Sequence, residues 1–115
     1  MPDAVATFRL RVRVADAIAV GPGKIDLLEA IDATGSLTTA ARAIGMSYRR
    51  AWMLLDELNR SMREMAVETA AGGRSGGGSV LTRSGRELVE LYRRIERTAQ
   101  QANATDLDRL KRLLA

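Results

Sequence analysis

The fold is decided by one stretch of the sequence, Ser36-Leu-Thr-Thr-Ala-Ala-Arg-Ala-Ile-Gly-Met-Ser-Tyr-Arg-Arg-Ala-Trp-Met-Leu-Leu-Asp-Glu-Leu58. Ala40 and Ala41 are small residues at a position where two helices must cross closely. Gly45 supplies the left-handed backbone that a short turn needs. Ser47 then caps a new helix at once, and Ala51 keeps its crossing tight. This order of residues predicts a helix-turn-helix.

Helices are predicted over residues 24–34, 37–45 and 47–62. The first shows apolar residues at helical spacing and ends at Gly35. Trp52 is expected to serve the core or a helix junction rather than to read DNA bases, and Met46, Met53 and Met62 are expected to fill the core. The side chains expected to face inward are Ile25, Leu28 and Ile31 in the first helix, Leu37, Ala40, Ala41 and Ile44 in the second, and Ala51, Leu54, Leu55, Leu58 and Met62 in the third.

The segment 7–14 alternates strictly and predicts an amino-terminal strand. Its expected buried side carries Phe8, Leu10, Val12 and Val14. The opposite side carries three arginines, and a solvated face guarding an edge strand is a better interpretation of them than a DNA contact. A second short apolar piece, residues 17–20, is expected to pair back on this strand.

A wing is predicted over residues 66–82, directly after the third helix. Residues 66–70 and 79–82 are short strand candidates, and a glycine-rich tip between them carries Arg74. A cationic wing tip lies along the phosphate backbone or enters the minor groove. The alternative is a tip that makes no contacts. A nucleotide-binding P-loop is excluded, because no lysine follows these glycines at the required spacing.

Residues 83–115 are predicted to form a helical dimerisation segment that begins at a capping Thr82 or Ser84. Its apolar stripe is too long for the core of so small a domain to cover, which favours a dimer seam. The alternative is a helix that folds back on its own domain. The proposed seam consists of Leu88, Leu91, Tyr92, Ile95, Ala99, Leu107, Leu110 and Leu114. Residues 1–82 then form the winged helix-turn-helix domain, and the fold class is mainly α with a small β component.

Candidate DNA contacts follow from how such a motif docks, with the first turns of the recognition helix in the major groove. Arg49 and Arg50 suit base edges, because arginine pairs with the guanine acceptors. Arg50 could instead pair with a carboxylate, and Tyr48 could instead staple the helix entry. The full set of candidates is Ser36, Thr38, Thr39 and Arg42 on the second helix, Ser47, Tyr48, Arg49 and Arg50 on the third, and Arg74 and Ser75 in the wing.

Composition limits the remaining possibilities. The chain has 115 residues, a net charge of +4, and neither cysteine nor histidine, which removes disulfides, the usual soft-metal ligands and the commonest general base. We therefore expect no enzyme and no metal site. Residues 36–86 hold eight cations against four anions, which places the positive charge on the motif. No apolar run approaches the roughly 20 residues of a membrane span, and no signal peptide is visible, so a cytoplasmic protein without a membrane partner is expected.

Several of these segments together resemble the ModE family of molybdate-responsive bacterial transcriptional regulators. The resemblance lies in residues 21–31, 35–52, 58–59, 68–85 and 91–92, above all in Ser47-Tyr-Arg-Arg-Ala-Trp52 combined with the glycine-rich wing. The helix-turn-helix is more distantly similar to that of LysR-type regulators.

This resemblance implies a homodimer on a roughly palindromic promoter site in double-stranded DNA, linked to molybdenum or related oxyanion homeostasis. Members of the family that sense molybdate carry further oxyanion-binding modules, and the sequence ends at Ala115 without them, so no cofactor is expected. Two alternatives stay open: a sensor that holds an oxyanion or another small molecule at helix starts or between subunits, and a winged helix used for protein–protein contact.

Overall fold

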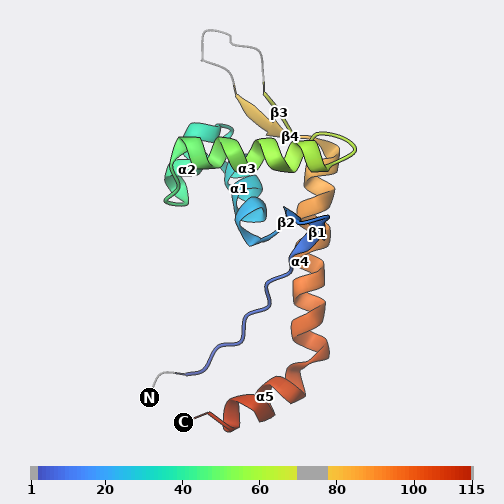
Figure 1. Cartoon of the computed structure of the whole chain (residues 1–115). Helices are drawn as coiled ribbons and strands as arrows, with labels where there is room; N and C mark the ends of the chain where they lie inside the picture. The colour runs from blue at the N-terminus through green and yellow to red at the C-terminus, as the bar shows by residue number, and fades with distance from the viewer. Residues whose placement is uncertain (1–2, 70–77, 115) are drawn as a thin grey trace.

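The computed structural model describes residues 3–69 and 78–114. Figure 1 shows a cluster of three helices, a hairpin on one side of it, and a long helix that leaves the cluster on the other. This is a mainly α winged-helix fold, as predicted. The elements in chain order are β1 (Val12–Val14), β2 (Ala17–Val20), α1 (Pro22–Thr34), α2 (Leu37–Ala43), α3 (Tyr48–Ser61), β3 (Val67–Thr69), β4 (Ser79–Leu81), α4 (Arg83–Ala102) and α5 (Ala104–Arg112).

The punctuation between α1, α2 and α3 follows the prediction. Gly35 ends α1 in the left-handed conformation with φ +73°, and Gly45 adopts φ +68° in the turn between α2 and α3. The Ser36 hydroxyl accepts a hydrogen bond from the Thr39 backbone N–H at 3.2 Å. Ser47 caps α3 in the same way. Since both caps use local side chains, each helix begins where the sequence places it.

The core lies where α1 is enclosed by the other helices and the base of the wing. Four large side chains of α1 are at most 1% exposed, and small alanines let α2 and α3 approach them. Val67 and Leu81 of the wing and Tyr92 of α4 complete the same cluster. The buried set is Ile25, Leu27, Leu28, Ile31, Ala40, Ala41, Ala51, Leu58, Ala66, Val67, Leu81 and Tyr92.

The wing strands β3 and β4 are antiparallel and are fixed at their base by side chains of neighbouring elements. The Asn59 side chain on α3 accepts hydrogen bonds from the backbone N–H groups of Ala66 and Val67 at 2.8 and 3.4 Å. The Thr82 hydroxyl donates to the Met65 carbonyl at 2.6 Å and also caps α4. The direction in which the wing leaves the domain is therefore set by α3 and by the start of α4.

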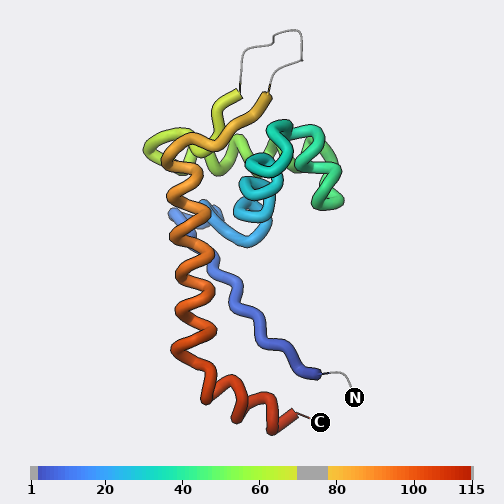
Figure 2. Tube along the Cα trace, turned by 180° about the vertical axis from the view of Figure 1, so that it is seen from behind, coloured from blue at the N-terminus to red at the C-terminus, as the bar shows by residue number. Residues whose placement is uncertain are grey.

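Helix α4 extends far beyond the helix cluster, and α5 bends away from its end (Figure 2). Arg93 holds α4 against α1, because its guanidinium pairs with Asp26 and Glu29 of α1 and with Glu96 of its own helix. These carboxylates raise the pKa of Arg93 above its ordinary value. No helix in residues 3–69 and 78–114 is long and apolar enough to cross a membrane.

The predicted strand over residues 7–14 is wrong in length, and its predicted buried face is confirmed only in part, since Phe8 and Leu10 are half-buried and Leu10 packs against the core. Only residues 12–14 form a strand, and Val12 and Val14 are 45% and 62% exposed. The partner strand β2 is short, so it cannot pair with the earlier residues. Residues 3–11, which we call the amino-terminal arm, lie beside α4 instead. There the Tyr92 hydroxyl donates to the Leu10 carbonyl at 2.7 Å, and the Gln100 amide donates to Ala6.

Two predicted core residues of α3 are on the surface. Trp52 is 51% exposed and Met53 is 48% exposed, so neither fills the core. The positions of Ala51 and Leu58, both at most 1% exposed, determine which side of α3 faces inward. With about 100° of rotation per residue, positions 52 and 53 turn away from that side. Ile44, which follows the end of α2, is also 36% exposed, whereas Met46 and Met62 do pack against the core as predicted.

Candidate nucleic-acid interface

The amino-terminal half of α3 buries Ala51 in the core and leaves the residues before it open to solvent. Ser47, Arg49 and Arg50 are exposed, and the Tyr48 side chain is 55% exposed. A side chain this exposed packs too little against its neighbours for Tyr48 to act as a hydrophobic staple. A helix with one buried side and one open side can be inserted into the major groove of a duplex without unfolding.

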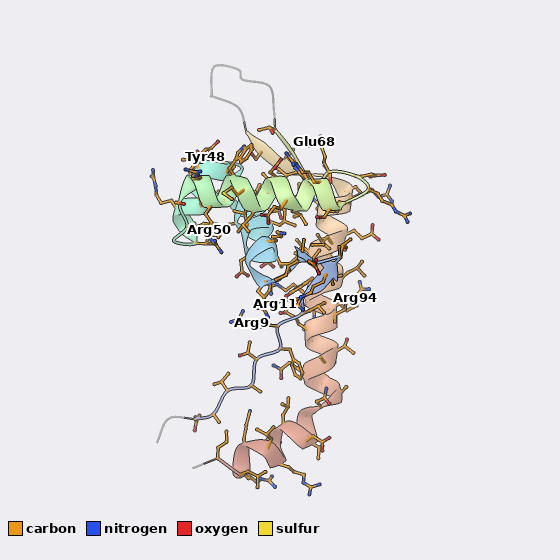
Figure 3. The ribbon with its side chains drawn as sticks, in the orientation of Figure 1. Arg9, Arg11, Tyr48, Arg50, Glu68 and Arg94 are labelled. Atoms are coloured by element: carbon orange, nitrogen blue, oxygen red, sulfur yellow. The ribbon has the colours of Figure 1, made fainter. Side chains whose placement is uncertain are left out.

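The consecutive side chains at the start of α3 point in different directions. Figure 3 shows Tyr48 on the side of α3 that faces the wing and Arg50 on the opposite side. Arg49 lies between them, because each residue advances by about 100°. Trp52 follows Tyr48 by one turn and therefore shares its side.

We call Tyr48, Arg49, Trp52 and Met53 the reading face. The prediction included Tyr48 and Arg49 but missed Trp52 and Met53. The signal that could have found them is their angular offset from the small, inward-facing Ala51. The same geometry separates the two predicted base-contacting arginines, since Arg50 belongs to the side turned away from the wing (Figure 3).

The candidates on α2 and at the starts of α2 and α3 divide into exposed side chains and hydroxyls that cap the helices. Thr38, Thr39 and Arg42 are exposed. The hydroxyls of Ser36 and Ser47 are acceptors in the helix caps, so their first role is to begin the two helices. The backbone N–H groups at such helix starts are suited to phosphate oxygens.

The described part of the wing exposes acidic, polar and apolar side chains. Glu68 and Thr69 are exposed, and Val80 is 49% exposed; Glu68 lies near the root of the hairpin above α3 (Figure 3). The predicted contacts Arg74 and Ser75 lie outside the described residues. The wing's own contribution to binding therefore stays a prediction.

Ion pairing leaves the arginines of α2 and the start of α3 free for other partners. Within the described parts of the chain, ion pairs are formed by Lys24, Arg60 and Arg93 only. Arg50 therefore makes no ion pair with a carboxylate of these residues, contrary to that alternative. Free guanidinium groups can form charge-assisted hydrogen bonds with phosphates and base edges.

The predicted dimer stripe is divided between the chain's own core and its surface. Tyr92 is 2% exposed and belongs to the core, and Leu88 packs against the same cluster, so assigning Tyr92 to the seam was wrong. Burial and the nearby Glu96 carboxylate raise the pKa of the Tyr92 hydroxyl. Ala99 and Leu107 are half-buried. The residues that remain open on α4, α5 and the end of the chain are Leu91, Ile95, Leu110, Leu113 and Leu114, between 43% and 86% exposed.

A helix-turn-helix followed by a two-stranded wing, with an open amphipathic third helix, places the chain among winged helix-turn-helix proteins. No protein-family model matches the chain. It is 36% identical over 97 residues to the DNA-binding transcriptional dual regulator ModE of Escherichia coli K12, and 43% identical over 96 residues to the molybdenum transport protein ModE of Azotobacter vinelandii. Both matches cover 84% of the chain.

A third match, 42% identical over 77 residues and 67% of the chain, is to the molybdenum-pterin-binding protein MopB of Rhodobacter capsulatus. Over most of its length the chain is therefore similar to part of these ModE and MopB proteins. It spans 37%, 34% and 28% of the length of these three proteins.

Proposed function

We propose that this chain is a sequence-specific DNA-binding transcriptional regulator that acts as a homodimer on a roughly palindromic promoter site. The observation that carries the proposal is the reading face, which is open to solvent beside the wing. Its Arg49 is exposed and makes no ion pair within the described residues.

In the proposed complex, the amino-terminal half of α3 enters the major groove. Arg49 donates a bidentate pair of hydrogen bonds to a guanine, and Trp52 and Met53 supply apolar contact to thymine methyl groups. Exposed Thr38, Thr39 and Arg42 face the adjacent phosphates and fix the register of the protein on the duplex. Nothing in this arrangement calls for a metal, a cofactor or a catalytic group.

The names of the relatives support the DNA-binding regulatory role and point to the process that it serves. The Escherichia coli relative is a DNA-binding transcriptional regulator, and the Azotobacter vinelandii relative is a molybdenum transport protein. We propose that this chain regulates genes of molybdenum or related oxyanion homeostasis in the bacterial cytoplasm. Because it spans about a third of each relative, both the regulated process and the homodimer belong to the proposal.

The test is an anisotropy titration with duplexes selected by the protein from a random pool, repeated at several salt concentrations. We expect the affinity to fall steeply as salt rises, because bound counterions are released from the duplex. Arg49→Ala should cost about 1–3 kcal/mol and relax the base preference at one position of the site.

Arg13→Ala is the matched control, because Arg13 is an exposed arginine on β1, away from the reading face. It should leave both the affinity and the selected sequence unchanged. If the pool yields no enriched sequence, or if Arg49→Ala and Arg13→Ala behave alike, the proposal fails.

A further inference from the structure

A cavity of about 900 Å³ opens on the side of α3 that faces away from the wing. Its walls come from the amino-terminal arm, the β1–β2 turn, the start of α1 and one side of α3 along most of its length. Figure 3 shows Arg50 on this side of α3, with Arg9 and Arg11 on the arm below it. All three arginines line the cavity.

The positive charge in this cavity is only partly neutralised by the protein. Lys24 is already satisfied, since its ammonium donates to the Ile18 carbonyl at 2.6 Å and pairs with Glu57 at 3.3 Å. Arg60 pairs with Asp56 at 3.1 Å.

The other cations of the cavity are Arg9, Arg11 and Arg50, and none of them is in an ion pair within residues 3–69 and 78–114. Asp16 is the one further carboxylate along the wall. Three guanidinium groups from two separate segments therefore face a shared space with an excess of positive charge.

We propose that this cavity binds a small phosphorylated organic molecule. Arginine forks match the oxygens of a phosphate in a bidentate way, and three of them suit a diphosphate better than a single small anion. The cavity is also larger than an inorganic oxyanion needs, and Ile18, Pro22 and Leu54 give it an apolar part. That combination of a cationic end and an apolar wall is typical of sites for organic ligands.

The position of the cavity makes a duplex a poor occupant. Arg9 and Arg11 come from the arm, which lies on the side of the helix cluster opposite the wing (Figure 1). A duplex that contacted the reading face and the wing would lie on the other side of α3. The ligand would instead contact Arg50 and Leu54 of α3. These residues lie on the side of α3 away from the reading face.

The test is isothermal titration calorimetry of the full chain without DNA, so its result does not depend on the proposed function. The probes are adenosine diphosphate, inorganic pyrophosphate and adenosine. We expect saturable binding of adenosine diphosphate, weaker binding of pyrophosphate because it lacks the organic part, and no heat from adenosine. The double variant Arg9→Gln/Arg11→Gln should bind adenosine diphosphate at least about tenfold more weakly, since each lost charged hydrogen bond is worth roughly that factor.

Arg13→Gln is the control, because Arg13 is exposed on β1, which directly follows the arm, and does not line the cavity. It should bind like the unaltered chain. Circular dichroism should show the same helical content for all three proteins, since the altered side chains are on the surface.

Three outcomes overturn the inference. The first is the absence of saturable heat with both adenosine diphosphate and pyrophosphate, and the second is equal binding by the double variant and the control. The third comes from duplex titrations without ligand. If Arg9→Gln/Arg11→Gln weakens duplex binding and flattens its salt dependence, these arginines contact DNA phosphates; unchanged duplex binding supports the separate site.

Discussion

At the scale of single residues, the sequence predicts the caps and turns well because their chemistry is local. Ser36, Ser47 and Thr82 each accept a hydrogen bond from a backbone N–H three residues on, and Gly35 and Gly45 have positive φ. Each of these features depends on a few neighbouring residues, so a pattern in the sequence is enough to find it.

The exposure of Trp52 and Met53 shows where local patterns fail. Large apolar residues in a helix usually face the core, and this reasoning placed both inside. The small Ala51 and the more distant Leu58 determine the inward side of α3. An exposed tryptophan beside Arg49 is better explained as part of a binding surface than as packing.

Tyr92 gives a prediction at this scale. Its pKa is raised by burial and by Glu96, whereas tyrosine in an unfolded chain ionises near pH 10. Between about pH 10 and the raised pKa of the folded state, the unfolded chain loses its proton first, so this group's contribution to stability is complete below about pH 10 and is lost as pH rises. Tyr92→Phe should cost about 1 kcal/mol at neutral pH, because the hydrogen bond to Leu10 disappears, and should make the alkaline decline shallower.

Urea denaturation from pH 7 to pH 11 measures both effects. Tyr48→Phe is the control, because it changes an exposed tyrosine. If the curves of the unaltered chain and Tyr92→Phe run parallel through the alkaline range, the buried environment assigned to Tyr92 is incorrect.

At the scale of elements, helices could be predicted more reliably than the amino-terminal strand. The ends of α1, α2 and α3 agree with their predicted bounds within about two residues, because helical hydrogen bonds join residues close in the sequence. A strand needs a partner. The alternation over residues 7–14 indicates a strand but does not give the length of its partner. Because β2 is short, only Val12–Val14 pair with it.

The junction between the wing and α4 provides a prediction for Gly85. A Cβ on Gly85 would overlap the carbonyl oxygen of Ala66, which belongs to the backbone and cannot move away easily. Gly85→Ala should therefore destabilise the fold by about 1–3 kcal/mol through overpacking. The comparison is Gly23→Ala in α1, where the added methyl would meet only the Leu54 side chain at 4.0 Å.

Gly23→Ala should be neutral or stabilising by up to about 1 kcal/mol, since alanine favours the helix. Thermal unfolding followed by circular dichroism compares the two variants. Equal melting temperatures for Gly85→Ala and Gly23→Ala would show that the start of α4 does not pack on the wing as closely as described.

At the scale of the whole molecule, the elongated shape follows from α4. The chain measures 57 × 32 × 24 Å along its principal axes, because the second half of α4 and α5 reach beyond the helix cluster. The sequence indicated an apolar stripe on this segment but could not assign each residue to the core or to a partner. That assignment depends on how α4 packs on α1 through Arg93, which joins residues more than 60 positions apart.

If the exposed apolar residues of α4 and α5 form the dimer interface, a single charge placed among them should separate the subunits. Ile95 of α4 is 50% exposed, and Ile95→Glu should convert the dimer into monomers because a buried unpaired carboxylate is costly. Gln101→Glu adds the same charge to an exposed site on another side of α4 and should leave the dimer intact. Sedimentation equilibrium gives the masses, and a monomeric unaltered chain at micromolar concentration would refute the seam.

The measurement that tests the central claim most directly asks whether α3 lies in the groove of a bound duplex. The chain has no cysteine, so Met53→Cys provides a single attachment point on the reading face for an iron–EDTA group, and Gln101→Cys provides one on α4. With a duplex selected by the protein, the group at position 53 should cut the DNA at a few adjacent positions inside the site, and the group at position 101 should leave those positions uncut. A tagged Met53→Cys protein that binds the duplex without cutting it there would contradict the account.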